Sequence, residues 1–149
     1  MNKNPIVKIT KYLLDFMFYA GVVVCAAVPW LFHMAGKFFR IFRDYYIPYS
    51  IIFMLSGVFA LIILWNLRKM FDTVLCEDPF VRGNVISLKR MGACAFVIAA
   101  LMAVRLLFIV TPAALVLVVV FLIAGLFSIV LSLVFDQAVT YKQENDLTI

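Results

Sequence analysis

The feature that most restricts the fold is the apolar tract from Met91 to Phe135, which a single charged residue, Arg105, interrupts. As one straight helix at 1.5 Å per residue, this tract would be about 65 Å long, roughly twice the thickness of the hydrocarbon core of a bilayer. It must therefore fold back on itself. Pro112 is the strongest helix breaker in the tract, and it also disfavours helical geometry in the residue before it. The sequence predicts a tight hairpin there, with membrane spans over residues 91–110 and 112–135.

Two further runs are long and apolar enough to cross a membrane: residues 13–34, with only Asp15 near one end, and residues 47–67, without any charge. The 149-residue chain is 66% hydrophobic and only 14% charged, with a mean hydropathy of +1.11. A soluble domain of this size could not bury so much apolar surface, because small domains bury the smallest fraction of theirs. We predict one all-α domain, an integral membrane four-helix bundle.

The distribution of basic residues predicts the orientation, because cytoplasmic loops carry an excess of lysine and arginine. The segment between the first two spans holds Lys37, Arg40 and Arg43, whereas the termini and the segment between the second and third spans hold Lys3, Lys8, Lys11, Arg68, Lys69, Arg82, Lys89, Arg90 and Lys142. This asymmetry places both termini, the loop 68–90 and the tail 136–149 in the cytoplasm of a multi-pass protein of the cell membrane. The net charge of +5 then indicates attraction to anionic lipids at the cytoplasmic face, with no direct binding to nucleic acid.

Both long connecting segments carry helical patterns. In the outer segment 37–46, apolar residues recur at helical spacing, which predicts an interfacial helix among the headgroups; a flap over an outer cavity is the alternative. An apolar stripe over residues 67–75 predicts that the second helix continues beyond the membrane. Asp78-Pro79 predicts a turn, and Gly83-Asn84 predicts a break, with Asn84 as the N-cap of the third helix.

Two polar residues in or beside the spans are candidates for an intramembrane site. Arg105 is the one charge well inside a span, and such residues are functional candidates by default. Because it lies about five residues from the outer hairpin, we expect its guanidinium to extend to the headgroups. The alternative is an anionic partner in an outer-leaflet cavity, with His33 nearby. Asp15, near the inner boundary, is expected to be solvated or to pair with Lys11 one helical turn away.

No set of residues has the pattern of an active site or a metal site. His33 is the only histidine, so a multi-histidine metal site is excluded. There is no glycine-rich phosphate loop, and Cys25, Cys76 and Cys94 lack a paired spacing. We therefore expect no disulfide, no metal, no cofactor and no enzymatic activity.

Two cytoplasmic stretches resemble a known family. The first runs Asp78-Pro79-Phe80, then Asn84-Val85, Leu88-Lys89-Arg90 and Gly92, and the second is Glu144-Asn145-Asp146-Leu147-Thr148-Ile149. They are similar to the central motif and the closing segment of the YoaS-like family, small four-span bacterial membrane proteins of unknown function. Members are often encoded beside a small helix-turn-helix regulator. The resemblance thus implies a membrane partner or anchor for a small cytoplasmic DNA-binding regulator.

The leading functional hypothesis is a membrane-embedded regulatory or anchoring protein that presents its cytoplasmic loop and C-terminal tail to a soluble partner. The residues expected to bind that partner are Asp78, Pro79, Phe80, Asn84, Glu144, Asn145, Asp146, Leu147, Thr148 and Ile149. The apolar residues that end the acidic tail would either dock on the partner or fold back onto the central loop. One alternative is a small transporter or channel subunit with an outer-leaflet site at Arg105 and His33. Another is a structural membrane component that forms a homo-oligomer.

Overall fold

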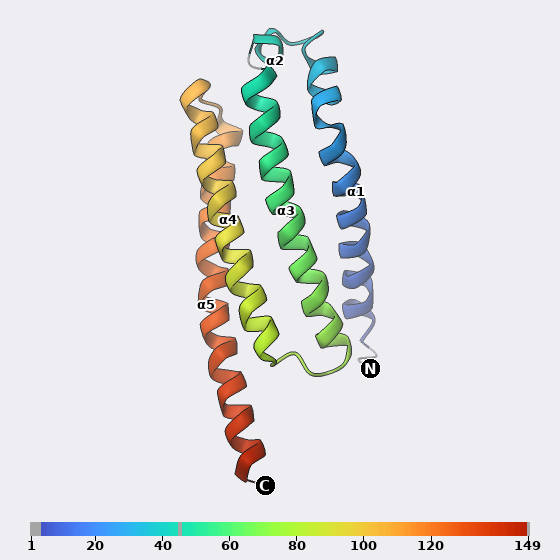
Figure 1. Cartoon of the computed structure of the whole chain (residues 1–149), viewed down its shortest axis with the longest axis vertical. Coiled ribbons are helices and arrows are strands. Elements are labelled where there is room, and N and C mark those ends of the chain that lie inside the picture. Colours follow the sequence, from blue (N-terminus) through green and yellow to red (C-terminus); the bar gives the residue numbers. More distant parts are fainter. Residues whose placement is uncertain (1–3, 45, 149) are drawn as a thin grey trace.

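The computed structural model describes residues 4–44 and 46–148, and the regular structure of this part is entirely helical. The helices are α1 (Pro5–Ala35), α2 (Arg40–Asp44), α3 (Tyr46–Leu75), α4 (Arg82–Phe108) and α5 (Pro112–Thr148) (Figure 1). Within the described residues, four helices are long and apolar enough to cross a membrane: α1, α3, α4 and α5. The prediction of an all-helical chain with four such helices is confirmed, and they indicate a multi-pass membrane protein.

The predicted hairpin lies at the expected proline. Helix α4 ends at Phe108, and α5 begins at Pro112. Proline is tolerated in the first turn of a helix, because the N–H groups there have no hydrogen-bond partner within the helix. The Thr111 hydroxyl accepts a hydrogen bond from the backbone N–H of Ala114 at 3.3 Å and so caps the new helix. A single proline therefore separates the long apolar tract into two antiparallel helices.

The connections between α1 and α3 and between α3 and α4 are shorter than predicted. Helix α3 continues to Leu75, which confirms the predicted extension of the second helix, and of the loop 68–90 only residues 76–81 lie outside helices. Because α4 already begins at Arg82, the predicted break at Gly83-Asn84 is wrong. The segment 37–46 contains the five-residue helix α2 and the first residue of α3, Tyr46. Tyr45 and the side chains of Ile41 and Phe42 lie outside the described part of the chain, so the predicted apolar face of this segment is not tested.

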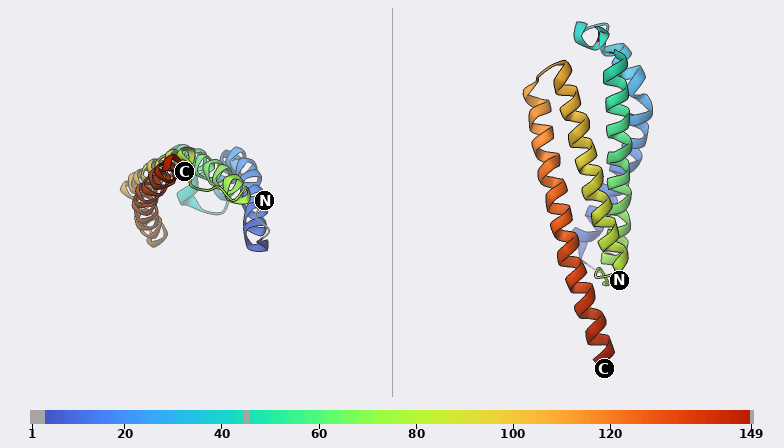
Figure 2. Two further views of the ribbon diagram at one scale, coloured as in Figure 1. Left: turned by 90° about the horizontal axis from the view of Figure 1, so that it is seen from below. Right: turned by 60° about the vertical axis from the view of Figure 1, so that its left-hand side comes forward.

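The four long helices form an open, curved row. Helix α1 packs on α3, α3 on α4, and α4 on α5, while α1 and α5 make no contact among the described residues. Seen along the helices, the row is an arc with one concave side (Figure 2). Its core is centred on Ile52, Ile98 and Met102. Large apolar side chains cover the outer surface, among them Phe16 and Phe127, which are 70% and 65% exposed. Contact of such a surface with water would cost a large amount of free energy, whereas contact with lipid would not.

Small residues bring α4 and α5 into the closest contact of the fold. A Cβ atom on Gly92 would lie 2.7 Å from the Cδ1 atom of Ile129, and one on Gly125 would lie 2.9 Å from a facing aromatic ring. The Ser128 hydroxyl donates a hydrogen bond to the Leu88 carbonyl at 2.7 Å. Membrane helices associate through such small faces and cross-helix hydrogen bonds.

Along the helix axes, the four-helix array has two ends. One, called the terminal end here, carries the start of α1, the end of α5 and the 76–81 loop, and the other, the distal end, carries α2 and the turn between α4 and α5 (Figure 1). Helix α5, with 37 residues, is about 55 Å long, well beyond the roughly 30 Å of a hydrocarbon core. Its C-terminal part extends past the other helices at the terminal end (Figures 1 and 2).

Candidate functional site

At the terminal end, charged side chains join the loop of residues 76–81 and the start of α4 to α5. The Lys142 ammonium donates a hydrogen bond to the Asp78 carboxylate, and the Arg82 guanidinium donates one to Asp136. These pairs join positions more than fifty residues apart in the sequence. The loop and the start of the α5 extension therefore lie against each other.

Asn84 holds this loop in shape from inside. Its side-chain nitrogen Nδ2 donates hydrogen bonds to the Pro79 carbonyl at 2.6 Å and to the Thr73 hydroxyl at 2.8 Å, and the residue is only 3% exposed. The predicted role as N-cap is wrong, because this side chain turns back onto the loop while the helix begins two residues earlier. Phe80 follows Pro79, packs its ring against Phe135 at a centroid distance of 5.3 Å, and stays 42% exposed.

The remaining predicted partner-binding residues lie along the end of α5. Glu144, Asn145, Asp146 and Leu147 are all exposed, and Leu147 is 86% exposed. Leu147 is therefore not buried against the central loop, and the fold-back alternative is wrong for this residue. The backbone of Thr148 closes α5, whereas its side chain and the whole of Ile149 lie outside the described residues. The structure thus separates the two predicted stretches into an anchored loop and a projecting helix end.

A second polar cluster at the terminal end joins α1 to α3. Arg68 donates to Asp15 at 2.7 Å, and Lys11 pairs with Asp72 at 2.6 Å. The expected pairing of Asp15 with Lys11 is wrong, because each finds a partner of opposite charge on the neighbouring helix instead. The Arg68 guanidinium also lies 5.5 Å from the ring centroid of Trp65 and within cation–π range of two rings of α1. The sequence alone did not reveal this cluster, since it depends on how α1 and α3 pack.

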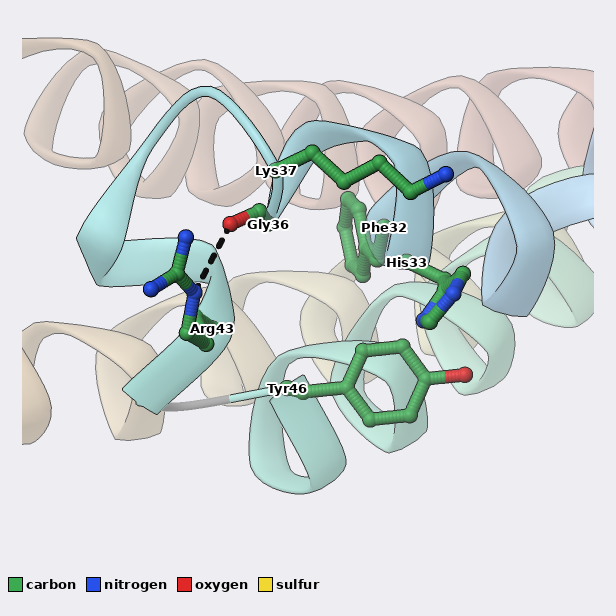
Figure 3. A pocket seen from close by; sticks show the side chains of 6 residues that line it. All are labelled: Phe32, His33, Gly36, Lys37, Arg43 and Tyr46. Carbon is green, nitrogen blue, oxygen red and sulfur yellow. Dashed lines mark hydrogen bonds between the residues drawn. The ribbon is translucent and has the colours of Figure 1, made fainter.

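The distal end carries a pocket of about 370 Å³ between α1, α2 and α3 (Figure 3). It is lined by Phe32, His33, Gly36, Lys37, Arg43 and Tyr46. Arg43 is fixed in place, because its Nε atom donates to the Gly36 carbonyl at 3.0 Å (Figure 3). The pocket thus combines cationic and imidazole groups with aromatic walls, and none of its lining residues is acidic. The sequence pointed to His33, but it did not show that Lys37 and Arg43 would lie around the same cavity.

Arg105 lies in a different setting at the distal end. Its guanidinium carbon is 5.1 Å from the ring centroid of Tyr49 and 5.5 Å from that of Phe53, and one of its terminal nitrogens donates to the Thr111 hydroxyl at 3.3 Å. Arg105 makes no ion pair with any described residue, and it does not line the pocket of His33. The structure therefore does not bring Arg105 and His33 into one cavity, and the extension of Arg105 to headgroups stays a prediction.

Residues suited to a metal ion are not clustered in the described part of the chain. No group of three His, Cys, Asp or Glu residues there is placed to hold a metal ion. Cys25, Cys76 and Cys94 are free cysteines. What the polar clusters offer is ion pairing, anion contact and docking surface.

Comparison with known proteins assigns the chain to a family. A sequence model of the family described as "Protein of unknown function (DUF2975)" matches residues 30–149, from the end of α1 through all of α5. Neither the curated proteins nor the solved structures contain a match to the chain. Because the matched region covers most of the sequence, the chain belongs to the DUF2975 family.

Proposed function

We propose that this protein is a membrane-embedded regulatory or anchoring protein that presents the 76–81 loop and the α5 extension to a soluble cytoplasmic partner. The observation that carries the proposal is the projection of α5 past the other helices, with every residue from 140 to 147 exposed. A short helix end without tertiary packing is only marginally stable in water. Docking on a partner would supply the missing contacts.

The loop provides the base of this surface. The pair of Asp78 with Lys142 holds the loop against α5, and the pair of Arg82 with Asp136 holds the start of α4 there, so loop and helix would be presented to the partner together. Beyond them, Glu144 and Asp146 give the helix end a negative charge next to the exposed Leu147. A complementary partner surface has basic residues around an apolar hollow. Burying Leu147 there would contribute roughly 1.5–3 kcal/mol.

The resemblance to the YoaS-like family supports one kind of partner, a small helix-turn-helix transcription regulator. In that case the membrane protein would hold the regulator at the membrane or release it from there. The chain itself would make no contact with nucleic acid. The acidic helix end favours contact with a basic protein surface of the regulator, because nucleic acid is itself negatively charged.

Deletion of residues 144–149 tests the proposal. We expect membrane insertion to be unchanged, because residues 144–147 are exposed and lie past the other helices, and we expect co-purification of the cytoplasmic partner from native membranes to be lost. Two point variants sharpen the test: Leu147→Ser should weaken capture, and Leu147→Met, which keeps an apolar side chain, should retain it. Unchanged capture after the deletion, together with unchanged output of a reporter for a neighbouring regulator, would contradict the proposal.

A second candidate function is a small transporter or channel subunit with a site at the distal end. The pocket of His33, Lys37 and Arg43 is the observation that favours it. Transport would also need a polar path through the helices, whereas the cavity next to this pocket is lined almost entirely by apolar residues. The distal pocket therefore supports binding better than it supports passage.

A further inference from the structure

An apolar groove lies next to the basic distal pocket. It has a volume of about 310 Å³ and takes lining residues from all four long helices, among them Val24 and Val28 of α1, Phe53 of α3, Met102 of α4 and Phe121 of α5. Because the two outer helices of the curved row, α1 and α5, both line the groove, it lies on the concave side of the row. Helix α2 also lies on that side when the row is viewed along the helices (Figure 2).

The groove and the basic pocket share one stripe of α1. Val24 and Val28 line the groove, and Phe32 and Gly36 continue at the same spacing of four residues and line the pocket. The Phe32 ring meets the Phe53 ring edge to face at a centroid distance of 5.0 Å, so the wall of one cavity passes into the wall of the other. Eight residues of helix from Val28 to Gly36 span about 12 Å.

The lining of the distal pocket carries positive charge, which suits an anionic ligand. Lys37 and Arg43 line the pocket without an acidic residue among its lining, and the bond from Arg43 Nε to Gly36 leaves the two terminal nitrogens of that guanidinium as donors. The neighbouring Arg40 differs, because it pairs with Asp44 at 3.6 Å and does not line the pocket.

We infer that the pocket and the groove together form a binding site for one anionic phospholipid. The phosphate occupies the pocket, whose lining supplies Lys37 and Arg43 as cationic groups, and an acyl chain lies along the groove. This occupant fits because it is anionic at one end and apolar along its length. A second copy of this chain would bring another basic distal segment, with Lys37, Arg40 and Arg43, against the same charges. A free phosphate would leave the apolar groove uncovered.

The headgroup half of the site is tested with Lys37→Gln and its matched control Arg40→Gln, which remove the same charge three residues apart. Each protein is purified in mild detergent, incubated with phosphatidylglycerol or with phosphatidylcholine of the same chains, and examined by native mass spectrometry. We expect one retained phosphatidylglycerol, preferred about three- to fivefold over phosphatidylcholine, as one or two partly exposed charge contacts would give. Lys37→Gln should reduce the preference toward parity, and Arg40→Gln should keep it.

The acyl-chain half is tested with Val24→Trp and its control Val23→Trp. Val24 is 54% exposed and lines the groove, so a large ring there fills the groove without entering the packed core; Val23 is 68% exposed and does not line it. Retention of phosphatidylglycerol should fall for Val24→Trp only.

Three results would overturn the inference. One is equal retention of the two lipids by the unaltered protein. Another is thermal stabilisation by inorganic phosphate alone that matches stabilisation by phosphatidylglycerol, which would show a free-anion site. The last is a dimer whose formation Val24→Trp abolishes, which would show that a second copy fills the groove.

Discussion

Replacement of Asn84 tests how the 76–81 loop is held. In Asn84→Leu, a side chain of similar size fills the same buried position but donates no hydrogen bond. The Pro79 carbonyl and the Thr73 hydroxyl then both lose their donor. A typical intramolecular hydrogen bond contributes about 0.5–1.5 kcal/mol, and leaving a buried partner unsatisfied costs more. We therefore expect a loss of about 1–3 kcal/mol in stability, with the damage concentrated at the loop.

Thr73→Val supplies the matched control for this prediction. It removes the contact with Asn84 at 2.8 Å and the hydroxyl's own hydrogen bond to the Met70 carbonyl at 2.6 Å, but it leaves the contact between Asn84 and Pro79, so its effect on the loop should be about half as large. In the double variant the two losses should not add, because both remove the same Asn84–Thr73 bond.

The assay is the apparent melting temperature in detergent together with the labelling rate of Cys76, which is exposed in the loop. For a chain of this size, about 1 kcal/mol corresponds to a shift of roughly 2–4 °C. Asn84→Leu should lower the melting temperature by several degrees and make Cys76 more reactive. Wild-type values for both in Asn84→Leu would refute the view that this side chain holds the loop.

Three further predictions concern helix packing and the charged side chains. Gly92→Leu should lower stability by about 1–3 kcal/mol, because its side chain would collide with Ile129, whereas Gly83→Leu, with no atom within 4 Å of an added Cβ, should leave the melting temperature near that of wild type. Arg68→Gln should lower the melting temperature more than Lys11→Gln does, because it removes contacts with three aromatic rings besides the pair with Asp15; equal shifts would argue against this. Arg105→Leu should change the melting temperature little, because the loss of the ring contacts is offset by removing a charge from within a membrane helix. A large drop in melting temperature would instead reveal an anionic partner.

The sequence was informative where a feature acts locally. The length and apolarity of the tract from Met91 to Phe135, with Pro112 inside it, were sufficient to predict two helices and the hairpin between them. The continuation of α3 to Leu75 followed in the same way from its helical stripe. Each of these features depends on residues within a few turns of one another.

The sequence was less informative where contacts join distant segments. Asp15 has an oppositely charged residue one turn away, so a pair with Lys11 was the natural expectation, yet Arg68 on α3 lies closer in space. Asn84 has the chemistry of an N-cap, but a partner on α3 and a carbonyl in the loop engage it instead. The distal pocket was missed for the same reason, since Lys37 and Arg43 line it only when α2 folds over the ends of α1 and α3.

The proposal that the loop and the α5 extension face the cytoplasm is tested most directly by cysteine labelling in intact cells with a membrane-impermeant maleimide. One protein keeps Cys76 with the other two cysteines replaced by alanine; two others lack all native cysteines and carry Arg40→Cys or Asn145→Cys. We predict that position 40 is labelled from outside, and that positions 76 and 145 are labelled only after permeabilisation. Labelling of position 76 or 145 in intact cells, with position 40 protected, would contradict the proposed orientation and place the partner surface on the wrong side of the membrane.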